Sequence, residues 1–125
     1  MLDPQRRARW SAVTLYAAVL FVASVVPSPL GRHPEFDRVG PDKALHLLGH
    51  AGFAALVADA LAADGVDARG AAVLSAGLSV AYGYALGRLQ ERVPGRVGER
   101  ADLVAGAVGS VLGVLGWRYT DRSGR

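Results

Sequence analysis

The stretch WSAVTLYAAVLFVASVVPSPLG, residues 10–31, contains no charged side chain. A second uncharged stretch covers residues 70–87, and two shorter ones cover residues 44–58 and 103–117. A helix that crosses a bilayer needs about 20 mostly apolar residues, with a range of about 17 to 25. The first two stretches meet this length, and the other two meet it when they extend past an acidic residue at one end. The sequence therefore predicts an all-α fold, an integral membrane bundle of four transmembrane helices.

Proline and glycine divide the chain into helices and links. We predict four helices and a polar tail, over residues 9–26, 42–63, 69–92, 100–119 and 120–125. The Pro-Ser-Pro sequence at 27–29 cannot continue a helix, and Pro94-Gly95 breaks the third one. Pro41 suits the first turn of the second helix. Short links between four spans make residues 1–125 a single compact domain with both termini on one side.

Small residues repeat within the third and fourth predicted helices. Gly109 and Gly113 lie four residues apart in VAGAVGSVLGVLGW, and Gly83 and Gly87 repeat this spacing earlier. In water each helix glycine costs about 1 kcal/mol relative to alanine, whereas in lipid small residues let helix backbones approach closely. This pattern favours a membrane bundle over a soluble all-α bundle. It also allows a homo-oligomer through the glycine-rich helix faces.

The charges favour a lipid environment and argue against nucleic acid as a partner. The net charge is +3, and the arginines lie in short blocks beside the hydrophobic stretches. The chain has no cysteine, which excludes disulfides and thiol chemistry. The basic N-terminus fits a flank that anchors the first span better than a cleaved signal peptide. Seven Lys and Arg residues fall on each side of the bundle. Some of the basic residues on the side away from the termini are expected to serve a site. When these are discounted, the excess of positive charge lies on the side of the termini, which predicts a multi-pass cell-membrane protein with both termini in the cytoplasm.

The remaining polar residues gather at one end of the predicted bundle. They open the second and fourth helices, close the third, and occupy the loop between the last two: Asp42, Lys43, His46, Gln90, Glu91, Arg92, Arg96 and Asp102. Successive helices alternate in direction, so these ends meet at the same membrane face. Ionisable residues within spans are costly, so they usually face the bundle interior, pair with one another and mark a functional site.

Three segments resemble the VanZ-like family of small polytopic membrane proteins: GPDKALHLLGHAGFAAL at 40–56, LQERVPGR at 89–96 and ADLVAGAVGSVLG at 101–113. The matching positions are Asp42, Lys43, His46, Gln90, Pro94, Gly95, Arg96, Asp102 and Gly109. The family name is associated with resistance to teicoplanin, so the resemblance implies a role in the cell envelope. Gly87 stands where the family has Glu, and Gly106 stands where it has Asn. Glu91, one turn after Gly87, is a partial replacement for the missing carboxylate.

The candidate ligand-binding residues are Asp42, Lys43, His46, Gln90, Arg96 and Asp102. Arg96 can bind a phosphate or carboxylate through its guanidinium, or it can pair with Asp102 and hold the loop. His46 can act as a general base oriented by Asp42 or Asp102, or it can bond to Gln90 across helices. His46 and His50 share a helix face, but zinc would need a third ligand such as Asp102. We predict no metal and no soluble cofactor.

Three functions fit these residues. The first is binding of a polar or phosphorylated lipid-linked headgroup in a pocket formed by one set of helix ends. The second is a membrane-embedded enzyme that acts on a phosphorylated lipid, with His46 and Asp102 as acid and base. The third is a small transport or flippase-like module. The sequence does not decide whether the chain is an enzyme, and the missing Glu at position 87 counts against catalysis.

Overall fold

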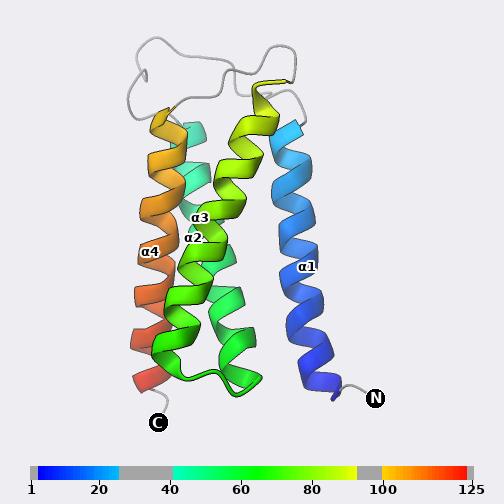
Figure 1. Ribbon diagram of the computed structural model, residues 1–125, viewed down its shortest axis with the longest axis vertical. Coiled ribbons are helices and arrows are strands. Elements are labelled where there is room, and N and C mark those ends of the chain that lie inside the picture. The colour runs from blue at the N-terminus through cyan, green and yellow to red at the C-terminus, as the bar shows by residue number, and fades with distance from the viewer. Residues whose placement is uncertain (1–2, 26–40, 93–99, 124–125) are drawn as a thin grey trace.

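The computed structural model describes residues 3–25, 41–92 and 100–123. These residues form four helices that lie side by side: α1 (Pro4–Val25), α2 (Pro41–Ala63), α3 (Ala68–Gln90) and α4 (Arg100–Ser123) (Figure 1). Each helix is long and apolar enough to cross a membrane. The described residues contain no strand. The predicted all-α bundle of four transmembrane helices is therefore confirmed.

Two helix ends differ from the predicted bounds by four or more residues, and the others agree within two. α1 begins at Pro4, because Asp3 caps it: the Gln5 amide donates to Asp3 Oδ1 at 3.3 Å and proline suits the first helical position. α4 continues to Ser123, four residues past the predicted helix end at 119, so the polar residues 120–123 are helical. No proline or glycine lies between Gly116 and Gly124 to end this helix, and its polar last turn can extend beyond the apolar layer.

The turn between α2 and α3 is set by local sequence. Gly65 has a φ of 98°, a conformation that favours glycine. Its amide donates to the Ala62 carbonyl at 3.1 Å and the Val66 amide donates to the Leu61 carbonyl at 3.0 Å, which together make a Schellman motif. Asp67 then caps α3, because its side chain accepts a bond of 3.1 Å from the Gly70 amide. This tight turn places α3 antiparallel to α2.

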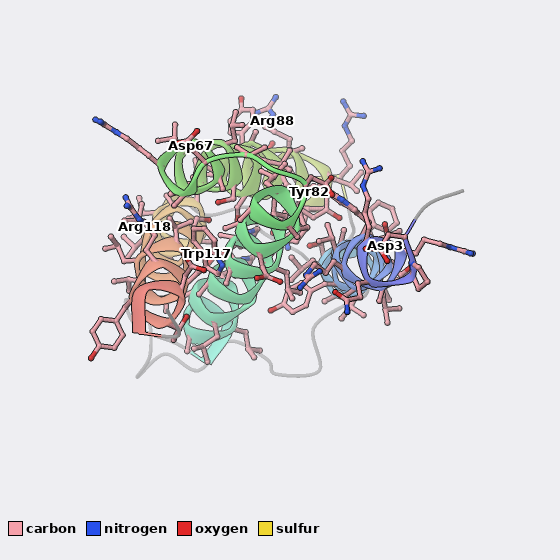
Figure 2. All side chains as sticks on the ribbon, turned by 90° about the horizontal axis from the view of Figure 1, so that it is seen from below. Asp3, Asp67, Tyr82, Arg88, Trp117 and Arg118 are labelled. Carbon is pink, nitrogen blue, oxygen red and sulfur yellow. The ribbon has the colours of Figure 1, made fainter. Side chains whose placement is uncertain are left out.

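The second helix is the centre of the bundle. α2 contacts each of the other three helices, and α1 lies at one side of the group (Figure 2). Both termini lie at the same end of the molecule, together with the α2–α3 turn (Figure 1). The starts of α2 and α4 and the end of α3 therefore meet at the opposite end, as the alternating directions predict.

Helices α2 and α4 approach each other closely through two glycines. A Cβ at Gly109 would overlap the carbonyl of Leu47, and a Cβ at Gly113 would overlap that of Ala51. Close backbone contact through small residues is the usual packing mode of membrane helices. Gly109 and Gly113 are thus used in packing inside the bundle.

Helix α1 is held to the bundle by aromatic and charged contacts. The Tyr82 hydroxyl donates to the Ala17 carbonyl at 2.6 Å, and Phe53 packs on both Tyr16 and Tyr82. A Cβ at Gly52 would overlap the Tyr16 hydroxyl, so glycine there makes room for this ring. These contacts fix α1 against α2 and α3 in the middle of its length.

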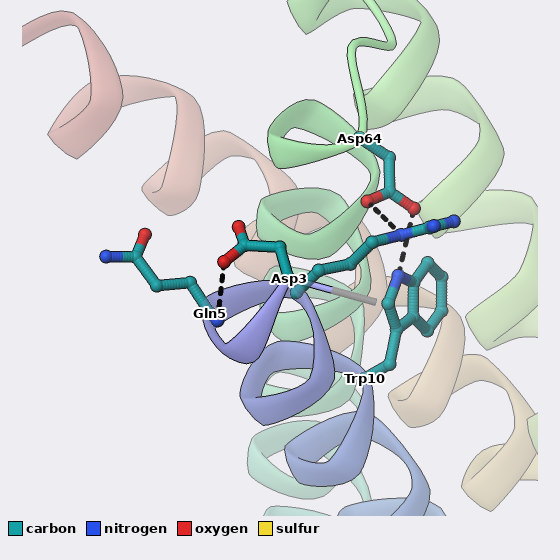
Figure 3. Close-up of polar contacts among 5 residues, drawn as sticks. Asp3, Gln5, Trp10 and Asp64 are labelled. Atoms are coloured by element: carbon teal, nitrogen blue, oxygen red, sulfur yellow. Dashed lines mark hydrogen bonds and ion pairs between the residues drawn. The ribbon is translucent and has the colours of Figure 1, made fainter. Parts of the chain in front are cut away.

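The end of α1 nearest the termini is joined to the α2–α3 turn. The Trp10 indole donates to Asp64 Oδ2 at 3.0 Å, and Arg6 pairs with Asp64 Oδ1 at 2.8 Å (Figure 3). Arg9 pairs with Asp59 at 3.2 Å. The bond from Trp10, opposed by burial and reinforced by Arg6 and Arg9, holds the pKa of Asp64 below its usual range.

Candidate functional site

A cavity of about 240 Å³ lies between α2, α3 and α4, close to the end where α3 stops and α4 starts. Its lining includes three of the predicted ligand-binding residues, His46, Gln90 and Asp102. It also includes His50, which was not among them. The structure therefore brings together side chains from three helices that are far apart in sequence.

His46 and Asp102 face each other across the α2–α4 contact. His46 Nε2 lies 3.8 Å from Asp102 Oδ2, and their side chains are 22% and 13% exposed. This separation fits an ion pair when the imidazole is protonated and is too long for a hydrogen bond. Asp102 lies in the first turn of α4, where the helix dipole favours a carboxylate. The predicted acid–base pair is therefore close in space.

His50 is the most buried titratable group of the cavity, with 4% of its surface exposed. Its ring stacks on that of His46, with the centroids 6.3 Å apart and the planes inclined by 7°. Ser79 Oγ lies 3.4 Å from His50 Nδ1, and Ser110 Oγ lies 2.7 Å from Ser79 Oγ. The sequence signal for this residue was its four-residue spacing from His46, which places both rings on one helix face.

The two glycines at 83 and 106 make room for the His50 ring. A Cβ at Gly83 would lie 3.0 Å from His50 Cε1, and a Cβ at Gly106 would lie 3.1 Å from His50 Cδ2. Both separations are tighter than ordinary van der Waals contact, so larger residues would displace the imidazole. Gly106 was noted as a departure from the VanZ-like pattern, and the space beside it is filled by His50.

Gln90 ends α3 inside the cavity wall. The residue is 3% exposed, and its side chain makes no hydrogen bond to any residue that the structure describes. The alternative bond between His46 and Gln90 is therefore not formed. Both side chains line the same cavity instead.

The rim of the cavity carries charges and one open position. Arg88 and Glu91 pair at 3.3 Å, with side chains 65% and 48% exposed. Figure 2 shows Arg88 pointing outward from α3. Gly87 also lines the cavity, and a Cβ there would meet nothing within 4 Å. The position where the family pattern has Glu is thus open space, and Glu91 lies at the rim beside it.

The outer edge of the cavity is apolar. Tyr84 of α3 and Leu103 of α4 belong to its lining and are 55% and 37% exposed. They face outward from helices that are apolar enough to cross a membrane. Exposed apolar side chains and buried polar ones therefore line the same cavity.

The remaining predicted site residues lie partly or wholly beyond what the structure describes. Asp42 and Lys43 belong to the first turn of α2, but their side chains are outside the described part. Arg96 lies outside the described residues altogether. Within the described residues no group of three His, Asp or Glu side chains is arranged to hold a metal ion.

No protein-family model matches the chain, and comparisons with curated proteins and with solved structures return no match. The resemblance to the VanZ-like family therefore stays a prediction that rests on the spacing of its motifs.

Proposed function

We propose that the chain binds a polar or phosphorylated lipid-linked headgroup in the cavity between α2, α3 and α4. One observation carries this proposal: the polar side chains of His46, His50, Gln90 and Asp102 line one cavity together with the exposed apolar side chains Tyr84 and Leu103, between helices apolar enough to cross a membrane. An amphiphile matches such a site, because its headgroup can enter the polar part while its hydrocarbon chain stays in the bilayer. Polar groups within spans are expensive, and their usual reason is function.

The apolar edge supports a lipid over a water-soluble ligand. Tyr84 and Leu103 stand where the hydrocarbon chain would leave the site. Arg96, which belongs to the same predicted end of the bundle, would add a guanidinium for a phosphate. In this proposal the protein is a cell-envelope component related to the VanZ-like family, with both termini in the cytoplasm.

A cavity-filling variant tests the proposal. Gly87→Leu would place a side chain in the cavity, and Gly77→Leu is its control, because Gly77 is exposed on the same helix with nothing within 4 Å of its Cβ position. We would purify each full chain in mild detergent and measure retained lipid by native mass spectrometry. The probes are a polyprenyl monophosphate, phosphatidylglycerol and, as the reference lipid, phosphatidylcholine.

The expected result is that the unchanged chain and the Gly77→Leu variant retain one probe lipid above the reference, and that Gly87→Leu loses it. Equal retention of all lipids by the unchanged chain, or equal retention by both variants, would contradict the proposal.

A second candidate function is acid–base catalysis on a phosphorylated lipid. The approach of His46 Nε2 to Asp102 Oδ2 favours it, since a carboxylate can orient an imidazole that takes up a proton. Release of inorganic phosphate from the polyprenyl monophosphate would be measured for the unchanged chain and for His46→Ala and Asp102→Asn. Turnover that both substitutions abolish would favour the enzyme, whereas lipid retention without turnover would favour the binding protein.

A further inference from the structure

The innermost polar surface of the cavity is made by His50, and its ring is fixed from behind. Ser79 Oγ lies 3.4 Å from His50 Nδ1 and 3.3 Å from the His50 carbonyl oxygen. The Ser110 hydroxyl lies 2.7 Å from Ser79 Oγ and 2.8 Å from the Gly106 carbonyl oxygen. Both serines are fully buried. Two hydroxyls thus join α2, α3 and α4 behind the imidazole and occupy its Nδ1 edge.

The other ring nitrogen of His50 points to the gap between α3 and α4. Nε2 lies 3.2 Å from the Cβ position of Gly83 and 3.6 Å from that of Gly106, and both glycines line the cavity. Among the residues that the structure describes, Nε2 has no hydrogen-bond partner. His50 lines the cavity, so a ligand there that supplied a partner for Nε2 would gain a hydrogen bond.

Gln90 is a second polar side chain of the cavity lining, at the end of α3. Its side chain is almost completely buried, lines the cavity, and makes no hydrogen bond within the described part of the chain. A primary amide both donates and accepts, and so does a neutral imidazole across its two nitrogens. Hydroxyl groups also do both, so they match this pair better than an anion does.

The charges that line the described cavity support this choice. His46 and Arg88 face the carboxylates of Asp102 and Glu91, and the two pairs lie 3.8 Å and 3.3 Å apart. The described lining therefore has no excess of cations at its innermost part. Within the described lining, the arginine that could meet a phosphate is the exposed Arg88, which is already paired with Glu91.

We propose that His50 Nε2 and the Gln90 amide form a hydroxyl-recognition site, which binds the polyol or sugar part of a lipid headgroup. This proposal rests on the proposed function and specifies which part of the headgroup enters deepest. Ser79 is a positioning residue, because it holds the Nδ1 edge of the ring and leaves Nε2 to the ligand.

A pair of lipids that differ only in hydroxyl groups tests this inference. Phosphatidylglycerol and phosphatidylpropanol carry the same charge and nearly the same volume, but the second lacks both headgroup hydroxyls. Monoglucosyl diacylglycerol and its tetradeoxy analogue, which keeps the sugar ring but lacks its hydroxyl groups, make the corresponding pair for a sugar. Retention of each lipid by the full chain in detergent is measured by native mass spectrometry.

The unchanged chain is expected to prefer the hydroxylated lipid of at least one pair by about tenfold, the effect of one to two hydrogen bonds. His50→Phe and Gln90→Leu are each expected to abolish the preference. Gln90→Leu keeps the test valid if the larger ring at position 50 prevents folding. Ser79→Ala is expected to reduce the preference. Ser75→Ala is its control, because within the described residues this equally buried serine bonds only to the Ala72 carbonyl, at 3.1 Å.

The outcomes separate this inference from the function on which it rests. Equal retention of both lipids in each pair, combined with loss of both in Gly87→Leu, would overturn hydroxyl recognition and leave lipid binding in place. Retention of no probe above phosphatidylcholine would overturn both. A preference that survives in both His50→Phe and Gln90→Leu would overturn the assignment of these residues.

Discussion

Replacing Gly109 by alanine tests the contact that brings α2 and α4 together. The added Cβ would overlap the Leu47 carbonyl oxygen and would lie 2.9 Å from Leu47 Cα. Ordinary contact begins at 3.4 Å, so the backbones must separate by at least 0.5 Å, the difference between these distances. The obstacle is backbone, which cannot rotate away as a side chain can.

The expected cost follows from two opposing effects. Overpacking a well-packed contact costs about 1–3 kcal/mol. Replacing glycine by alanine within a helix returns about 1 kcal/mol. Gly116→Ala is the control, because it lies on the same helix and its Cβ would meet nothing within 4 Å. We therefore expect Gly109→Ala to be less stable than Gly116→Ala by about 1–3 kcal/mol, which is the packing cost alone.

The assay is unfolding in dodecyl maltoside titrated with sodium dodecyl sulfate. The signal is the fluorescence of Trp117, which is 8% exposed and packs in the core, in a Trp10→Phe background common to all variants. Gly109→Ala should unfold at a lower fraction of dodecyl sulfate than Gly116→Ala. Identical midpoints for the two variants would refute the argument that the α2–α4 contact requires glycine.

Three further predictions use the same unfolding assay or a simple variant of it. Gly87→Ala adds a methyl group where the cavity has open space, so it should weaken lipid retention without lowering the unfolding midpoint. A lower midpoint would show that the space beside Gly87 is not open. Tyr82→Phe loses the bond to the Ala17 carbonyl and should cost about 0.5–1.5 kcal/mol, whereas Tyr84→Phe, at an exposed ring, should cost nothing measurable. Because the folded-state pKa of Asp64 is lowered, its stabilisation of α1 is present above about pH 4 and is lost as the pH falls through the folded-state value. The fluorescence emission of Trp10 should then shift on acidification, and Asp64→Asn should show the shifted emission already at neutral pH. Identical Trp10 emission in the unchanged chain and in Asp64→Asn at neutral pH would refute this prediction.

The fold was predictable from the sequence because it depends on the length and spacing of the apolar stretches along the chain. Uncharged stretches of helical length, separated by Pro and Gly, indicate spans regardless of how the spans pack. The helix ends were harder, since they depend on single capping residues. Asp3 and Pro4 form a start signal upstream of the predicted start at residue 9, and no proline or glycine between residues 117 and 123 marks the predicted end at 119.

The site was predictable only in part, because it depends on which helix faces meet. Alternating helix directions were enough to bring His46, Gln90 and Asp102 to one cavity. The role of His50 was missed, since its environment is created by Gly83 and Gly106 on other helices. In the sequence pattern, Gly106 stands where an Asn is expected and so indicates the loss of a polar group. In the structure, the absence of a side chain at Gly106 makes room for the His50 imidazole.

The close contact between α2 and α4 and the geometry of the site depend on each other. The two helices run parallel, and Leu47 and Ala51 meet Gly109 and Gly113 one turn apart on each helix. His46 and His50 each precede one of these contact residues on α2, so the same register brings them beside Asp102 and Gly106. Any substitution that widens the backbone contact must also change the distance between His46 and Asp102 and loosen the packing around His50. The glycines of α4 therefore determine the shape of the cavity as well as the stability of the bundle. Gly109→Ala is accordingly expected to lose lipid retention through the widened contact, although Gly109 does not line the cavity.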